Sequence, residues 1–105
     1  MGRKRARTVR REVQRVDEKL ARMRAKLADL AEGGSPERPI EVVASSQIEV
    51  RAEAIECPIC AGSQKVQEHE AETIEGRRLR LVDVKCRHCG TPRRYYFEIV
   101  GRTPN

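Results

Sequence analysis

The sequence is poor in aromatic residues and contains no long apolar run. Among its 105 residues there is no Trp, two Tyr and one Phe, and hydrophobic residues make up 38%. Such a chain cannot bury one large core, so we expect one small domain with appendages that needs a metal or disulfides to stay folded. The N-terminus is basic and lacks the apolar segment of a signal peptide, and no stretch approaches a membrane span in length. We therefore expect a cytoplasmic, nucleoid or nuclear protein that is not secreted and has no membrane partner.

Histidine is also scarce. Only His69 and His88 are present, and no nucleophile stands near a base in a recognisable arrangement. We therefore expect no catalytic residues, no enzymatic activity and no small-molecule substrate.

The four cysteines form two pairs, Cys57 with Cys60 and Cys86 with Cys89, each with two residues between them. A tight turn of this length, called a knuckle below, points both sulfurs to one side. Gly62 and Gly90 follow the knuckles, and we expect them to take the positive φ that closes each turn. Two facing knuckles complete a tetrahedron of thiolates, so we predict one structural zinc ion bound by all four cysteines. Rubredoxin-like iron and a disulfide or dithiol switch are the alternatives, and His88 is either a spacer or a substitute ligand.

Positive charge is concentrated in the N-terminal third. Residues 1–32 contain eleven Lys and Arg against five Asp and Glu, whereas residues 33–105 contain eleven of each. This asymmetry predicts an arm that binds an acidic partner such as nucleic acid, and a solvated charged terminus is the alternative. The candidate phosphate-binding residues are Arg3, Lys4, Arg5, Arg7, Arg10 and Arg11, with Arg87, Arg93 and Arg94 beside the second knuckle.

Residues 8–32 carry apolar side chains at alternating steps of four and three, beginning at Val9, with no Pro or Gly between them. The pattern predicts a long coiled-coil-like helix with Thr8 as its N-cap. We predict that this helix associates with a second copy or with a partner helix, and packing on the protein's own domain is the alternative. The predicted association seam is Val13, Val16, Leu20, Met23, Leu27 and Leu30.

The charges beside the seam bear on helix orientation. In a parallel homodimer Glu12 would face Asp17 and Lys19 would face Arg24, and both pairs repel. An antiparallel pair brings Asp17 beside Arg24 twice, although Lys19 then faces Lys26. The charges therefore favour an antiparallel pair or a different partner helix.

The rest of the chain reads as a linker followed by strands. Two Gly and two Pro in residues 33–39 predict a flexible linker. Residues 40–43 are expected to be extended, and the alternation in residues 47–55 predicts a half-buried strand. Residues 93–100 read as the last strand, with Tyr95, Phe97 and Ile99 on its inward face.

A hairpin is predicted between the knuckles. With Gly76 in the left-handed region at the end of a three-residue loop, Val66 would pair with Val84. The same register predicts two cross-strand ion pairs, Glu72 with Arg78 and Glu70 with Arg80. Arg87, Arg93 and Arg94 would then be the main unpaired cations of this part of the chain.

The order knuckle, hairpin, knuckle and strand, with Cys-Pro-Ile-Cys and Cys-Arg-His-Cys-Gly, resembles the zinc ribbon superfamily over residues 47–100. Zinc ribbons occur in transcription factors, RNA polymerase subunits, ribosomal proteins and adaptor modules, so the resemblance implies a fold rather than one function. The predicted fold is small α+β: a basic arm and heptad helix at 1–32, the linker at 33–39, and a zinc ribbon of short antiparallel strands with a short tail at 40–105.

Two functions fit these features. In the first, the protein associates with nucleic acid or a nucleoprotein complex through its basic arm and helix, and the zinc ribbon docks or reads. In the second, the helix builds an oligomer or adaptor whose zinc ribbon binds a protein partner. Both hypotheses assign a non-enzymatic role to the chain.

Overall fold

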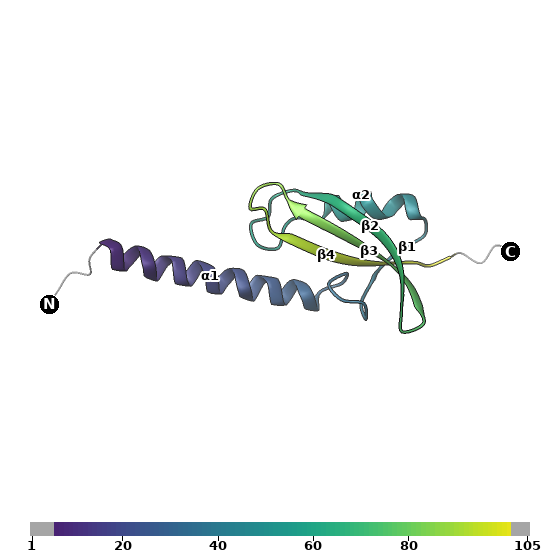
Figure 1. Ribbon diagram of the computed structural model, residues 1–105, viewed down its shortest axis with the longest axis horizontal. Helices are drawn as coiled ribbons and strands as arrows, with labels where there is room; N and C mark the ends of the chain where they lie inside the picture. Colours follow the sequence, from purple (N-terminus) through teal and green to yellow (C-terminus); the bar gives the residue numbers. More distant parts are fainter. Residues whose placement is uncertain (1–5, 102–105) are drawn as a thin grey trace.

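The computed structural model describes residues 6–101, with side chains from residue 8 onward, as one long helix beside a small sheet (Figure 1). The elements are α1 (Ala6–Leu30), β1 (Ile40–Val42), the 3₁₀ turn η1 (Ser45–Gln47), α2 (Ile48–Ala54), β2 (Gln64–Ile74), β3 (Arg77–Cys86) and β4 (Pro92–Ile99). The predicted α+β class and long N-terminal helix are confirmed. The sheet with α2 is called the head below.

The head is a four-stranded sheet in the order β1-β4-β3-β2. β1 runs parallel to β4, and the other neighbours are antiparallel. The inward face of β4 carries Tyr95 and Phe97, both buried as predicted. Across this face they join the core residues Ile40, Val42, Ile48, Ala52, Val82 and Val84.

The predicted strand over residues 47–55 is wrong, because α2 occupies most of it. Ile48 and Ala52 are fully buried, whereas Val50 is 70% exposed. Side chains four residues apart share one face of a helix, so Ile48 and Ala52 reach the core together and Val50 points away from it. α2 is a helix that covers the core face of the sheet.

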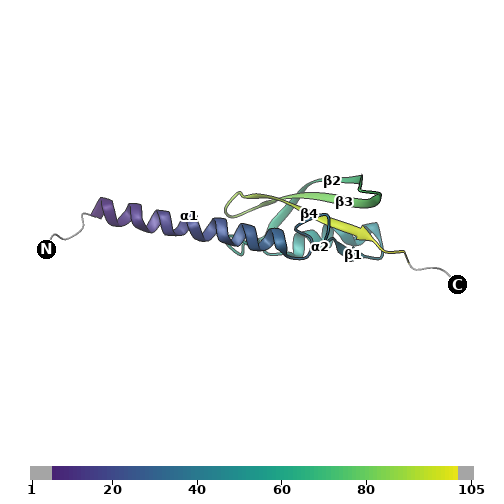
Figure 2. The same cartoon turned by 90° about the horizontal axis from the view of Figure 1, so that it is seen from below.

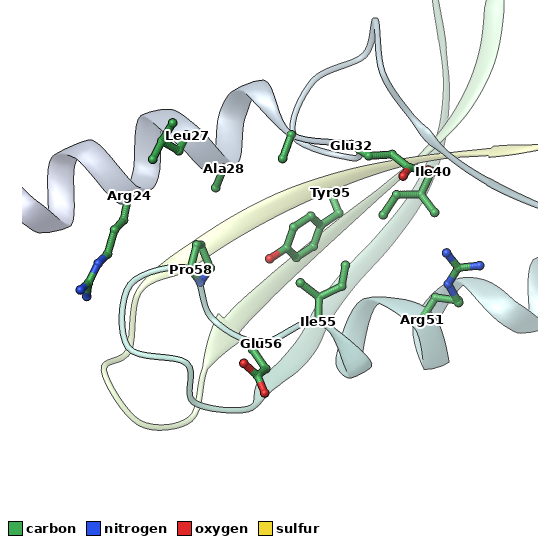
Figure 3. A pocket seen from close by; sticks show the side chains of 11 residues that line it. Arg24, Leu27, Ala28, Glu32, Ile40, Arg51, Ile55, Glu56, Pro58 and Tyr95 are labelled. Carbon is green, nitrogen blue, oxygen red and sulfur yellow. The ribbon is translucent and has the colours of Figure 1, made fainter.

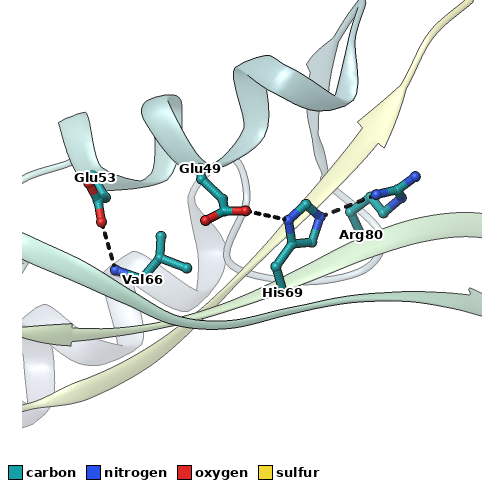
Figure 4. A network of polar contacts seen from close by, with 5 residues as sticks. All are labelled: Glu49, Glu53, Val66, His69 and Arg80. Atoms are coloured by element: carbon teal, nitrogen blue, oxygen red, sulfur yellow. Dashed lines mark hydrogen bonds and ion pairs between the residues drawn. The ribbon is translucent and has the colours of Figure 1, made fainter.

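Polar contacts hold α2 against β2 (Figure 4). Glu53 Oε2 accepts a hydrogen bond of 3.0 Å from the backbone N–H of Val66. Glu49 Oε2 lies 3.2 Å from Nδ1 of His69, and Nε2 of His69 lies 3.4 Å from a guanidinium nitrogen of Arg80. The first of these contacts occupies a donor on the outer strand of the sheet and so covers part of its edge.

The β2–β3 hairpin has a different register from the predicted one. Its turn contains two residues, Glu75 and Gly76, with φ of 50° and 79°, as a type I′ turn requires. The two predicted glutamate–arginine pairs are therefore wrong: Glu72 lies opposite Leu79 and Glu70 opposite Leu81. The predicted pairing of Val66 with Val84 is confirmed, because the pairing shifts by one residue between Val66 and Glu68.

α1 begins before Thr8, which lies inside the helix and is not its N-cap. At the other end, an Arg38 guanidinium nitrogen donates to the carbonyl of Leu30 at 2.7 Å, which satisfies one terminal carbonyl. Figures 1 and 2 show the N-terminal half of α1 extending past the sheet and its C-terminal half lying beside it. Much of the helix surface is therefore left uncovered by the head.

The segment between α1 and β1 is held by hydrogen bonds. Gly33 is buried, its φ is +84°, and its carbonyl accepts from the N–H of Tyr96 at 2.9 Å. A Cβ at Gly33 would lie 2.6 Å from Cδ1 of Ile40, so this position has no room for a larger residue. These bonds bring the end of α1 to the edge of β4. The predicted division of the chain into domains stays a prediction.

Candidate metal centre

The two knuckles have the same backbone geometry. In the first, Ala61 N donates to Cys57 O at 2.8 Å and Cys57 N donates to Gly62 O at 2.8 Å. In the second, Gly90 N donates to Cys86 O at 3.1 Å and Cys86 N donates to Thr91 O at 3.0 Å. Each turn is therefore closed by a pair of bonds at equivalent positions, which orients the two cysteines of each knuckle alike.

The residue with positive φ stands four positions after the first cysteine of each knuckle. In the second knuckle it is Gly90, as predicted, with φ of 75°. In the first it is Ala61, with φ of 62°, and the prediction for Gly62 is wrong. Gly62 is needed for space instead. A Cβ there would lie 2.8 Å from His88 Cβ and 3.2 Å from the sulfurs of Cys60 and Cys86.

The four sulfurs gather at one end of the sheet. All lie within 4.8 Å of one another, with 3.7 Å between Cys57 and Cys89 and 3.4 Å between Cys60 and Cys86. Zinc–sulfur bonds of about 2.3 Å in a tetrahedron set the sulfurs about 3.8 Å apart. Cys57 and Cys86 are buried, Cys60 is partly buried and Cys89 is exposed. The cluster is within metal-binding distance and is consistent with a zinc-binding ribbon.

Backbone N–H groups point at the sulfurs. Gly62 N lies 3.4 Å from Cys60 Sγ, and His88 N and Cys89 N lie 3.3 and 3.4 Å from Cys86 Sγ. Such donors stabilise thiolates, the form in which cysteine binds a metal. His88 contributes its backbone only. Its side chain is exposed and outside the cluster, which fits a spacer rather than a ligand.

The thiols have unequal acidities. The pKa of Cys89 is lowered to about 6, first by a side-chain and a backbone hydrogen bond at Thr91. The pKa of Cys60 is raised to about 12: the Gly62 N–H lowers it, but burial and the neighbouring thiols raise it by more. Four adjacent thiols cannot all ionise without a cation among them. A divalent metal supplies that charge, so the donor set fits zinc, and four sulfurs leave no open position for a reactive water.

The predicted nucleic-acid residues lie in different surroundings. Arg10 and Arg11 are exposed on α1, and Arg87 is exposed in the second knuckle. Arg93 and Arg94 are not unpaired as expected: Arg93 binds an Asp29 carboxylate oxygen of α1 at 2.7 Å, and Arg94 binds Asp83 at 2.7 Å. Their role in nucleic-acid binding stays a prediction. Arg3, Lys4 and Arg5 and the side chain of Arg7 lie outside the described part of the chain.

A further set of cations lies along α1. Arg15, Lys19, Arg22 and Lys26, called the basic row below, follow one another at steps of four, three and four, so they share one side of the helix. All four are exposed, and none forms an ion pair within residues 8–101. The candidate phosphate-binding residues named from the sequence in the N-terminal third all precede Glu12, so they do not include this row. The spacing within the heptads was the signal that identifies this row.

A neighbouring side of α1 contacts the head. Arg24 donates to the carbonyl of Ile59 in the first knuckle at 2.8 Å. Arg93, whose side chain is 10% exposed, donates to the carboxylate of Asp29 and, at 3.4 Å, to the carbonyl of Ala25. These contacts fix the C-terminal half of α1 against the head and leave its apolar seam exposed.

A groove of about 520 Å³ lies between α1 and the head (Figure 3). Leu27 and Ala28 line it on the helix side, and Ile55, Pro58 and Tyr95 line it on the side of the head. Charged residues also border it, with Arg24 and Glu32 from α1 and Arg51 and Glu56 from the head. α1 is therefore held against the head mainly by the polar contacts of Arg24 and Asp29, and the groove between the helix and the head is open and largely apolar.

Comparisons of the chain with protein-family models, with curated proteins and with solved structures find no significant match. Within residues 6–101, no helix combines the length and the apolar character that a membrane crossing requires.

Proposed function

We propose that this chain is a non-enzymatic zinc-ribbon protein that binds nucleic acid through the basic residues of its N-terminal third, with the head as a docking or reading element. One structural zinc ion, held by Cys57, Cys60, Cys86 and Cys89, would keep the head folded. The observation that carries the proposal is the basic row of α1, four exposed cations without ion pairs among the described residues. Phosphate backbones bind unpaired cations of this kind without sequence specificity.

The arginines of the head contrast with the basic row of α1, which supports placing phosphate binding on the helix. Three of its arginines are paired with carboxylates, Arg77 with Glu98 at 2.9 Å and Arg93 and Arg94 with aspartates. Paired cations carry little excess charge for phosphates. The available excess is therefore on α1, and in the head Lys85 and Arg87, on either side of Cys86, are exposed cations next to a candidate metal ligand.

The test is a salt series with labelled DNA and RNA duplexes. Replacing all four residues of the basic row by Gln should weaken binding and flatten the slope of log affinity against log salt by about three units, because each phosphate contact contributes a little under one. Fluorescence anisotropy measures both quantities. Unchanged affinity and slope would contradict the proposal.

The matched control removes the same charges from the head. Arg51, Lys65, Arg78 and Lys85 are all exposed, and their replacement by Gln alters net charge equally. We expect this variant to bind nearly as the parent does. Equal losses in both variants would show a general charge effect and not a site on α1.

A second candidate function is assembly through the seam of α1. The six seam residues are 42% to 68% exposed, and nothing in the described part of the chain covers them. An apolar stripe of this length is an interaction surface more often than a solvated one. Sedimentation measurements should show self-association that Leu20→Lys abolishes, whereas Val50→Lys, at an exposed apolar site on α2, should leave it unchanged.

A further inference from the structure

We propose that two copies of the chain pair through antiparallel α1 helices, and that this pairing merges their basic rows into one nucleic-acid-binding face with both heads on the other side. The pairing sets Leu20 of one copy opposite Met23 of the second. The proposal that the shared face binds nucleic acid rests on the function proposed above. The proposal that the two helices pair does not depend on that function.

The seam is accessible along its whole length. Leu27 and Leu30, beside the head, are 66% and 68% exposed, more than Leu20 at 42% in the middle of the helix. Leu27 also lines the groove between α1 and the head, so a second helix would lie beside the mouth of that groove at this end of the seam. An antiparallel partner would cover the seam from Val13, opposite Leu30, to the equivalent pair at the other end.

Charges on one flank of the seam select the antiparallel register. Asp17 and Arg24 stand on this flank, and the two-fold axis sets each beside the other residue of the second copy, giving two attractive pairs. Arg24 uses one guanidinium nitrogen for the Ile59 carbonyl, and its remaining donors, which make no other polar contact within residues 8–101, can reach the aspartate of the second copy. In a parallel pair Asp17 would instead face Glu12 and be repelled.

The opposite flank carries the basic row. Lys19 would face Lys26 of the second copy twice, and Arg15 and Arg22 lie just outside them. The two rows would place eight cations on one face, with Glu12 near each end. Like charges across a seam weaken a helix pair, so an anion on that face would stabilise this arrangement. A phosphate backbone supplies it, and its binding should therefore tighten the dimer by linkage.

Each head approaches this face only at the C-terminal end of its own basic row. α1 contacts its head through Arg24 and the Ala25 carbonyl, on the far side from Lys19 and Lys26, and through Asp29, which stands three residues after Lys26. The heads thus flank the side of the pair that carries the Asp17–Arg24 contacts. The face with the two basic rows is open to a long ligand.

A single substitution tests the orientation, because the two orientations predict opposite signs. Asp17→Arg should weaken the dimer about tenfold in an antiparallel pair, where both Arg24 contacts become repulsive, and strengthen a parallel pair, where its repulsion with Glu12 becomes attraction. The double variant D17R/R24D should restore antiparallel dimerisation. Sedimentation equilibrium at low salt without nucleic acid measures all three. A stronger D17R dimer, or no dimer in the parent protein, would overturn the pairing.

The shared face is tested by K19Q/K26Q. We expect this variant to dimerise more tightly alone, because the lysine repulsion is removed, and to bind a labelled DNA or RNA duplex more weakly. Unchanged duplex affinity with an intact dimer overturns the shared face, and the proposed nucleic-acid function falls with it only if the four-residue variant of the basic row also binds duplex unchanged. A protein that binds duplex as a monomer, with a salt slope that depends on the basic row, overturns the pairing and leaves the proposed function standing.

Discussion

Substitutions at two adjacent residues of the first knuckle should change the free energy of unfolding in opposite directions: Ala61→Gly should raise it, and Gly62→Ala should lower it. Ala61 has φ of 62° and is exposed, so Ala61→Gly removes left-handed strain of about 1–2 kcal/mol. Glycine also raises the conformational entropy of the unfolded chain, which offsets about 0.4–1 kcal/mol of this stabilisation. We expect a net stabilisation of about 0.5–1 kcal/mol, or a few degrees in the melting temperature of a domain this small. Thermal unfolding of the zinc-loaded protein, followed by circular dichroism, measures it.

Gly62→Ala should have the reverse effect and should reach the metal. Its Cβ would lie 3.2 Å from two ligand sulfurs and 2.8 Å from His88 Cβ, so the knuckles must move apart. Overpacking of this kind costs about 1–3 kcal/mol, and because metal binding and folding are coupled, zinc affinity should fall about tenfold or more. Competition with a chromophoric chelator measures the affinity. Gly101→Ala is the control, since a Cβ there contacts nothing within 4 Å. A destabilised Ala61→Gly, or a Gly62→Ala that binds zinc normally, would refute the reasoning.

Two further predictions concern the sheet. Tyr95→Phe removes the hydroxyl that accepts a 2.8 Å hydrogen bond from buried Gln64, and should lower the free energy of unfolding by about 1 kcal/mol in a denaturant titration, more than Tyr96→Phe does. Asp83→Asn should lower it by less than about 1 kcal/mol, because the ion pair with Arg94 is partly exposed. The Arg94 hydrogen bond holds the pKa of Asp83 below its usual 3.8. That contribution is therefore fully present above pH 3.8 and is lost as the pH falls through the lowered value, so the parent and the variant should converge in stability only below pH 3.8.

The four-cysteine cluster could be predicted from the sequence because its geometry is local. Two residues between cysteines fix each knuckle, and four ligands without a surplus define the donor set. The position of the left-handed residue was mistaken in the first knuckle. Glycine's freedom made Gly62 the natural candidate, but the turn requires positive φ at Ala61 and open space at Gly62. Space around a residue depends on the facing knuckle, which the local sequence does not contain.

α2 was mistaken for a strand because its short sequence fits two periods. Ile48, Val50, Ala52 and Ala54 alternate with polar residues, yet Ile48, Ala52 and Ile55 are also spaced four and three apart, as on one face of a helix. Burial decides between the two, and burial depends on the sheet that α2 covers. The contact between Arg93 and Asp29 shows the same limit, since these residues are 64 positions apart and are brought together only by the fold.

The same measurement tests the metal and the assembly state: native mass spectrometry of the full chain. The account predicts a species with one zinc ion per chain and the mass of two chains, in which Cys86→Ser loses the metal. It also predicts that Leu20→Lys separates the chains without removing zinc. A folded chain that carries no metal, or one whose mass shows the cysteines joined as disulfides, would contradict the central claim that the four thiolates hold a zinc ion.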